Sequence, residues 1–397
     1  MRKGRLWNTA ALVVLLAFLV CLFAGASGVG ANPTTATVGD LGIPGKLGKA
    51  IQEVPVGTGK GQIDPNAPRG FLGIPGAPQV NLVLAFLWAI WVGWIFSTVG
   101  AFGGIMAGVG HMTVFGLGAY AKSFKQTAPT VNKLLTDSIR VSNQFLVMLS
   151  SLVSSYNYYR VGRLVWPLGL ALGLGSIVGA VAIPWLTGGK VTFSQYQGWF
   201  GVFVFIVGAV LLYETTARGQ ASKKAAKEAA QAFEKSVKEK GSTVETGVKV
   251  TRWSASRVEF TFCGVEFGFN PIWPVLGGIV IAAISSFIGV GGGFLYVPFL
   301  TSIVGLPMFI VAGTSALTVF ISMVASITAY IKLAGAGVYW SLIGVELVGI
   351  FIGSIIGPRT QKYVPEIWLK RLFVVLALYV GIGYFSKGFF GQSWVPM

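Results

Sequence analysis

The chain has 397 residues, of which 54% are hydrophobic and only 11% are charged. Soluble domains carry about 25% charged residues, so this composition excludes an ordinary soluble protein and indicates a polytopic membrane protein. The formal net charge of +17 does not indicate nucleic-acid binding, because the basic residues mostly lie between apolar runs, as the positive-inside rule predicts. One histidine, two cysteines outside any CxxC and no GxxxxGK[ST] stretch predict no metal, redox motif, nucleotide or other cofactor.

The first 27 residues form a unit of their own. A basic start is followed by an almost wholly apolar run over residues 9–27, which is long enough for a first membrane span. The alternative is a signal peptide, with Ala24-Gly25-Ala26 as the small-residue cleavage site. Both readings place the Gly- and Pro-rich residues 28–78 outside the cytoplasm, and we expect an irregular segment there.

Ten apolar runs follow, five on each side of a polar interval. They cover residues 80–99, 103–121, 141–158, 164–186 and 199–213, then 271–290, 293–306, 310–333, 338–356 and 369–385. The sequence therefore predicts an all-α polytopic membrane protein with membrane repeats over residues 79–213 and 271–391, each of about five spans or broken spans. An odd number of spans in each half makes the two repeats inverted.

The linker over residues 214–270 contains two kinds of pattern. Residues 215–240 are rich in Ala, Lys and Glu and predict a solvated or membrane-surface helix. Residues 258–262 and 265–269 alternate apolar and polar around Cys263-Gly264, which predicts a short β-hairpin. Basic residues outnumber acidic ones in the linker, so we expect it to be cytoplasmic. Residues 122–140 then become a basic loop on the outer side, which runs against the same rule.

Glycine runs occupy corresponding places in the two halves. Gly289 aligns with Gly100, and Gly292-Gly293 align with Gly103-Gly104. Each glycine costs a helix about 1 kcal/mol against alanine, and irregular backbone survives in a membrane only where protein or a water-filled cavity satisfies it. We therefore expect two broken helices whose free N–H groups face a substrate. Close helix crossing is the alternative reading.

A second group of glycines has a regular spacing of four. Gly349, Gly353 and Gly357 follow Trp340, and Gly175 and Gly179 stand at the matching distances after Trp166. This spacing favours close helix packing rather than a site. We accordingly expect Gly292→Val to abolish function while the protein stays folded in the membrane, and Gly353→Ala to be milder.

The second half carries motifs of a known family. The run GVGGGFLYVPFL from Gly289, the stretch AGTSA from Ala312 and the stretch GAGVYW from Gly335 resemble the TauE/SafE family of anion permeases. The resemblance covers roughly residues 80–391 and is weaker in the first half. It implies a multi-pass protein of the bacterial inner (plasma) membrane, with the lipid bilayer and a small anionic substrate as its partners.

The function implied by this resemblance is secondary transport of a small sulfur oxyanion such as sulfite, sulfate or sulfoacetate. An anion channel and a transporter for another small anion remain alternatives. A membrane enzyme is disfavoured because the predicted spans lack a dense set of His, Asp and Glu. The anion, the direction, the coupling ion, the oligomeric state, protein partners and cleavage of the N-terminus stay open.

The candidate substrate-binding residues come from both halves and combine backbone amides with polar side chains. They are Gly103, Gly104, Asn143, Gly291, Gly292, Gly293, Thr314 and Ser315. The hydroxyls could donate to an anion or bond their own backbone one turn back, whereas an Asn facing lipid would be costly and should point inward.

Three further residues have two readings each. Glu346 is an acid within a predicted span and is a candidate for proton coupling, unless it is paired or hydrated. Arg140 precedes Asn143 by one turn and could attract the anion. His111 is either a packing histidine with satisfied hydrogen bonds or a proton relay.

Overall fold

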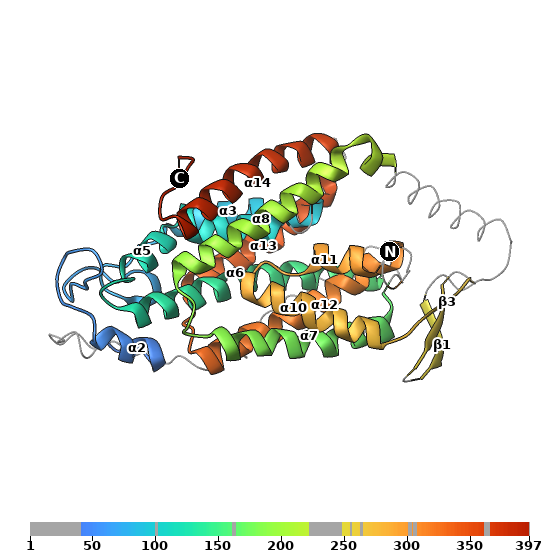
Figure 1. The fold of residues 1–397 in the computed structure, drawn as a ribbon, viewed down its shortest axis with the longest axis horizontal. Helices are drawn as coiled ribbons and strands as arrows, with labels where there is room; N and C mark the ends of the chain where they lie inside the picture. Colours follow the sequence, from blue (N-terminus) through green and yellow to red (C-terminus); the bar gives the residue numbers. More distant parts are fainter. Residues whose placement is uncertain are drawn as a thin grey trace, which may run out of the picture.

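The computed structural model describes residues 41–99, 102–160, 164–221, 248–254, 256–262, 265–300, 304, 308–360 and 366–396 (Figure 1). The predicted N-terminal span or signal peptide, most of the predicted linker helix and both cysteines lie outside the described residues.

Each predicted apolar run corresponds to a helix or a pair of helices. In the first half these are α3 (Leu82–Val99), α4 (Phe102–Val109), α5 (Leu117–Ser123), α6 (Pro129–Arg160), α7 (Trp166–Thr187) and α8 (Phe193–Thr215). In the second half they are α10 (Ile272–Ile288), α11 (Gly293–Pro298), α12 (Met308–Ala329), α13 (Trp340–Thr360) and α14 (Glu366–Phe389). Short π-helical segments, Gly110–Val114 and Tyr330–Ala334, extend α4 and α12.

Several of these helices have the length and composition of membrane spans. Within the described residues, Trp166–Thr187, Phe193–Thr215 and Gly313–Ala334 are long and apolar enough to cross a bilayer. Shorter apolar helices cover Leu82–Ser97, Ile272–Ile288, Trp340–Ile356 and Val374–Phe389. The helical membrane class predicted from composition agrees with these helices.

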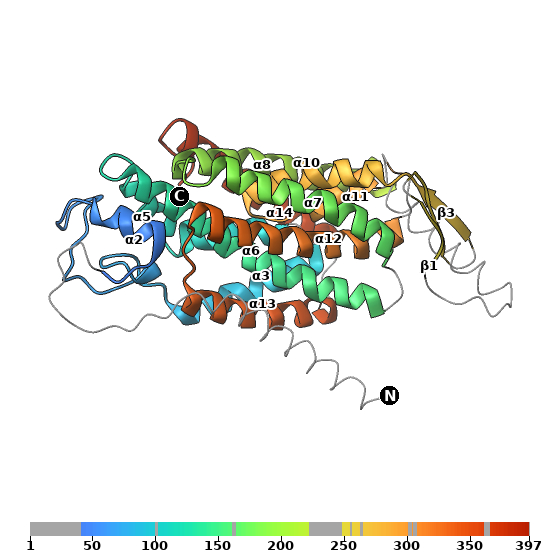
Figure 2. The same cartoon turned by 90° about the horizontal axis from the view of Figure 1, so that it is seen from below.

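The helices pack in pairs that join the two halves. α3 packs against α13 and α7 packs against α10, while α8 lies along α14 and α6 along α12 (Figures 1 and 2). By their order in each half, α3 corresponds to α10 and α7 to α13, so the pairs α3–α13 and α7–α10 are equivalent. α8 corresponds to α14 and α6 to α12, so each of the other two pairs joins equivalent helices. Almost every major helix contact is therefore made between the halves rather than within one of them.

The regularly spaced glycines lie in the first two of these pairs. A Cβ on Gly175 would be 1.9 Å from the carbonyl oxygen of Val275, and one on Gly353 would be 2.0 Å from that of Ile90. Backbone lies against backbone at both places, so the predicted packing role is confirmed. A methyl group at Gly353 would meet the carbonyl of Ile90, so we expect Gly353→Ala to cost stability even if its effect on function is milder than that of Gly292→Val.

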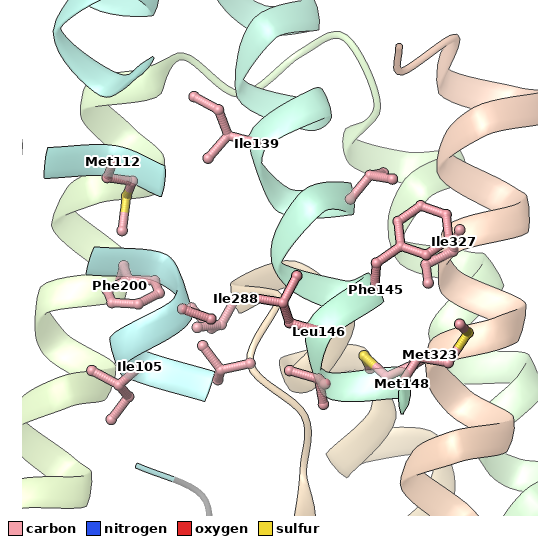
Figure 3. Close-up of a cluster of buried hydrophobic side chains, with 14 of the residues drawn as sticks. Ile105, Met112, Ile139, Phe145, Leu146, Met148, Phe200, Ile288, Met323 and Ile327 are labelled. Atoms are coloured by element: carbon pink, nitrogen blue, oxygen red, sulfur yellow. The ribbon is translucent and has the colours of Figure 1, made fainter. Parts of the chain in front are cut away.

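α6 runs through the centre of the bundle (Figures 2 and 3). Its side chains are buried almost without interruption from Val131 to Val153. The prediction of a loop over residues 122–140 is therefore wrong, since α6 begins at Pro129 and Arg140 is buried within the bundle. The start of this helix was not predicted because its first three turns contain few apolar residues. The polar side chains of these turns have partners within the protein and do not face lipid.

An apolar layer surrounds α6 on the sides that face α4, α8 and α12. Figure 3 shows Ile105 and Met112 on one side of α6, with Phe200 beside them, and Met323 and Ile327 on the other. These side chains are all buried. Polar groups inside the bundle thus lie in a low-dielectric surrounding, where an unpaired polar group is costly.

Two small structures cap opposite ends of the bundle (Figures 1 and 2). At one end, residues 41–80 form α2 (Gly45–Gln52) and a 3₁₀ turn, Phe71–Gly73, around the buried side chains of Ile51 and Ile63. Within the described residues 41–78, the predicted segment is thus largely irregular but contains a helix and a small core.

At the other end lies an antiparallel sheet in the order β1-β2-β3. Its strands are β1 (Val248–Trp253), β2 (Val258–Phe262) and β3 (Val265–Phe269), and the pairs Val258–Phe269 and Phe262–Val265 bound the β2–β3 hairpin. The hairpin is confirmed over the predicted residues, and β1 is an addition.

Candidate functional site

The glycine run of the second half interrupts a helix as predicted. α10 ends at Ile288, and α11 begins at Gly293. Gly289 and Gly291 both have a φ of 78°, in the left-handed region that residues with a Cβ rarely adopt. Glycine is therefore required at both positions for this backbone path.

The first half differs at the corresponding place, because Gly103 and Gly104 do not interrupt a helix. α3 ends at Val99 and α4 begins at Phe102, so Gly103 and Gly104 belong to the first turn of α4. A Cβ on Gly104 would lie 2.4 Å from the carbonyl oxygen of Val290. Gly104 is thus a glycine because the backbone of the other half lies against it, and the two glycine segments touch directly.

The second-half segment also lies against α6. A Cβ on Gly291 would be 2.6 Å from a methyl group of Val147, and one on Gly289 would be 3.3 Å from the carbonyl oxygen of Arg140 and 3.7 Å from the Cβ of Asn143. Three segments distant in sequence therefore meet at one place in the bundle interior: the start of α4, the break between α10 and α11, and the middle of α6.

A buried polar network occupies the same region. The Nδ1 atom of His111 lies 2.6 Å from Oδ1 of Asn143, and its Nε2 atom lies 3.1 Å from Oε2 of Glu346. All three side chains are fully buried. The amide of Asn143 also donates to the hydroxyl of Tyr196 at 3.5 Å, and that hydroxyl donates to the carbonyl of Ile288, the last residue of α10, at 2.9 Å.

This network supplies partners for two residues that have two readings each. His111 lies in an apolar helix, and both of its ring nitrogens have polar side-chain partners, Asn143 and Glu346. Glu346 is paired, although its Oε1 atom has no hydrogen-bond partner among the described residues. The pair joins the π-helical end of α4 to α13, and therefore joins the two halves.

Arg140 lies one turn before Asn143 on α6 and is also fully buried. Its Nη1 atom donates to Oδ1 of Asp137 at 3.0 Å and to the hydroxyl of Tyr330 at 3.3 Å. Oδ2 of Asp137 accepts a hydrogen bond of 2.7 Å from the N–H of Gly189. A charged pair thus lies beside the glycine break.

The remaining predicted site residues have other neighbours. Thr314 is buried, and its hydroxyl accepts a hydrogen bond of 3.1 Å from the N–H of Val165 at the start of α7. Ser315 is also buried. A Cβ on Gly292 would meet the Oγ of Ser285 at 2.5 Å, whereas the nearest atom to one on Gly293 belongs to Val319, at 3.8 Å.

Sequence reasoning considered His111, Glu346 and Arg140 one at a time and did not find their partners. Tyr196 was missed altogether, because one tyrosine in an apolar run has no pattern that distinguishes it. The partners of His111 and Tyr196 lie far along the chain, so no local spacing reveals them. Among the described residues no group of three His, Cys, Asp or Glu could hold a metal ion.

Comparison with known proteins supports the resemblance seen in the glycine motifs. The family model described as sulfite exporter TauE/SafE matches residues 84–384, which is most of the chain. No curated protein and no solved structure matches it in the same comparisons. The matched residues contain both glycine segments, α6 and the His111–Glu346 pair. The chain therefore belongs to the sulfite exporter TauE/SafE family, whose members are membrane permeases and not enzymes.

Proposed function

We propose that this permease is a secondary transporter for a small sulfur oxyanion such as sulfite, sulfate or sulfoacetate, in the bacterial inner membrane. The single observation that carries the proposal is the direct contact of the two glycine segments, with Gly104 against Val290, beside the polar middle of α6. Interrupted helices that meet at the interface of two halves are the usual place for substrate in transporters of this type.

The two halves are proposed to be inverted repeats of five helical segments. The exchange of partners between α3–α13 and α7–α10 supports this, because a two-fold pseudo-symmetry requires such reciprocal contacts. The matched glycines support it too, since Gly175 lies against α10 as Gly349 lies against α3. In repeats of this kind one half rocks against the other around a fixed site.

The proposed substrate site comprises Gly103, Gly104, Asn143, Gly291, Gly292, Gly293, Thr314 and Ser315. The contacts of Gly104, Gly289 and Asn143 support its centre. Thr314 and Ser315 enter the proposal through their sequence position alone, and Thr314 has its own partner at Val165. Backbone amides outside regular helix need acceptors, and an oxyanion supplies several at once.

Glu346 is proposed to couple transport to a proton through His111. An ionisable pair with no exposed surface in a membrane protein is a functional hypothesis by default. The pair crosses the interface between the halves, so its protonation would change the attraction between the parts that must move. The free Oε1 atom of Glu346 leaves room for a proton or a substrate contact.

Counterflow in proteoliposomes tests transport against the channel alternative. Vesicles that contain the purified protein are preloaded with unlabelled sulfite and diluted into a trace of labelled sulfite. A carrier must exchange the two, so label should accumulate transiently above its outside concentration. A channel only equilibrates the anion, and a flux that rises linearly with concentration and lacks this overshoot would contradict the proposal.

A further inference from the structure

Arg140 is enclosed by aromatic rings on the faces of its guanidinium group. The Cζ atom lies 4.5 Å from the ring centroid of Tyr196 on α8 and 4.8 Å from that of Phe287 on α10. The ring of Tyr330 follows at 5.9 Å. Rings that cover a planar cation stabilise it by cation–π attraction, and they leave only its edges for hydrogen bonds.

One edge of the guanidinium is used within the protein. Nη1 donates to Asp137 and to the hydroxyl of Tyr330. Asp137 is held in turn by the N–H of Gly189, which follows α7. These hydrogen bonds fix the orientation of the planar guanidinium group, and therefore also the direction in which its other edge points.

The opposite edge of the guanidinium has no partner in the part of the chain that the structure describes. Nε and Nη2 of Arg140 are buried and have no hydrogen-bond partner among the described residues. Two buried donors of a permanent cation without acceptors are energetically costly, because only well-placed acceptors offset the desolvation of a charged group. Unsatisfied groups of this kind in a native protein require an explanation such as an absent ligand.

The geometry of that edge specifies a ligand. Nε–H and one Nη2–H of an arginine point in parallel and match two oxygen atoms bonded to the same centre. We propose that the Nε–Nη2 edge of Arg140 binds two oxygens of the transported anion, so that the substrate class is a sulfite or sulfonate headgroup rather than a halide. This assignment rests on the proposed function and names the fixed charge of its site.

The position of Arg140 agrees with such a role. Its backbone carbonyl touches Gly289 at the glycine break, and Phe287 and Tyr196 connect it to the end of α10. The end of α10 that is nearest is a helix C-terminus, whose partial negative charge favours the guanidinium but not an anion. An anion at this place must therefore be attracted by Arg140, because the end of α10 does not attract it as a helix N-terminus would.

The enclosure itself comes from both halves of the chain. α6 and α8 of the first half supply Arg140 and Tyr196, and α10 and the π-helical end of α12 supply Phe287 and Tyr330. The guanidinium is fully buried, so an anion reaches it only when these helices separate. Binding and the relative movement of the halves are thereby linked.

Anion-dependent thermal stabilisation of the purified full-length protein tests this assignment. The probes are sulfite, methanesulfonate and chloride. The variants are Arg140→Lys and Asp137→Asn, with Arg257→Lys, at the exposed residue just before β2, as the matched control. Sulfite and methanesulfonate should stabilise the wild type and Arg257→Lys, whereas chloride should not. Arg140→Lys keeps the charge but loses the fork, and its affinity for both oxyanions should fall by about tenfold or more.

Asp137→Asn distinguishes a binding role from a purely structural ion pair. Removal of the competing carboxylate should raise oxyanion affinity several-fold, although the protein loses its ion pair. A structural role predicts lower stability in both variants with unchanged oxyanion affinity, and that result would overturn the assignment. If Arg140→Lys does not fold, Asp137→Asn alone decides by the same criterion.

The proposed function can fail separately. No counterflow of any oxyanion by the wild type would refute transport. If Arg140→Lys and the wild type show the same sulfite counterflow and the same stabilisation by sulfite, only the role of Arg140 is refuted.

Discussion

His111 and Glu346 come from opposite halves of the chain and lie within hydrogen-bond distance of each other in the bundle interior. The groups that face His111 are Glu346 on α13 and Asn143 on α6, with the carbonyl of Ala107 one turn back on its own helix. Tyr196 on α8 lies next to Asn143, and the Arg140–Asp137 pair lies one turn further along α6. If the carboxyl of Glu346 carries the coupling proton, its removal should affect energy coupling more than folding.

Glu346→Gln is therefore expected to abolish the acceleration of sulfoacetate flux by a pH gradient. The amide retains an oxygen for His111, so stability should fall by only about 1–2 kcal/mol. Flux in proteoliposomes with and without the gradient measures the effect. Glu259→Gln, on β2 outside the helix bundle, removes a carboxylate that is paired with Arg257 and serves as the control, which should transport as the wild type does. Full gradient dependence in Glu346→Gln would show that the proton is carried elsewhere.

The sequence predicted the residue types of this region better than their arrangement. An acid, a histidine and an arginine in apolar surroundings stand out individually, because each is costly in a membrane. Their pairing depends on how α4, α6 and α13 cross, and no local pattern contains that information. Arg140 was misread as a loop residue because the early turns of α6 have polar partners instead of an apolar face.

At the scale of helices, the spaced glycines determine how closely the halves approach. Gly179 lies against α10 and Gly353 against α3, and in both cases a Cβ would contact a backbone oxygen, those of Ile279 and Ile90. Small residues of this kind allow helix backbones to pack closely in a membrane.

Gly179→Ala and Gly353→Ala should each destabilise the protein, by about 1–3 kcal/mol, because the added methyl group forces two helices apart. The melting temperature of the purified variants measures the loss. Gly344→Ala is the matched control, since a Cβ at Gly344 on α13 would meet nothing within 4 Å. Equal melting temperatures for Gly353→Ala and Gly344→Ala would mean that α3 and α13 are not in close contact.

The helix boundaries were predicted well where apolar runs begin and end abruptly, as in α7 and α13. Boundaries were missed where buried residues are polar, as at the start of α6. The hairpin was recognisable because alternation has a period of two, whereas β1 was missed because basic residues interrupt its alternation. Gly103 and Gly104 were predicted to break a helix, but they lie in the first turn of α4 and allow close packing there.

At the scale of the whole molecule, residues 41–80 and the sheet lie at opposite ends of the helix bundle (Figure 1). In a membrane these ends face opposite compartments if the helices cross it. Single cysteines at Lys60 and Lys249, in a chain with Cys21 and Cys263 replaced, should therefore react differently with an impermeant thiol reagent. Intact cells should label Lys60→Cys, and Lys249→Cys should react only after lysis. Labelling of both positions in intact cells would contradict the crossing of the bundle.

The meeting of the two glycine segments is the centre of the functional proposal, and Gly292 lies within it. A valine at this position would collide with the Oγ of Ser285 and with Ile281, and would displace the break. The same substitution at Gly344 enters open space. Gly292→Val and Gly344→Val are thus the same substitution at two positions, one inside the glycine run and one in open space.

Sulfite uptake by proteoliposomes containing the wild type, Gly292→Val or Gly344→Val is the most direct measurement, with size-exclusion profiles of each variant to show that it is folded. The account predicts saturable uptake by the wild type and by Gly344→Val, and uptake at the level of protein-free vesicles by a folded Gly292→Val. Saturable uptake by Gly292→Val at the wild-type rate would show that the glycine run serves packing only and that the substrate binds elsewhere.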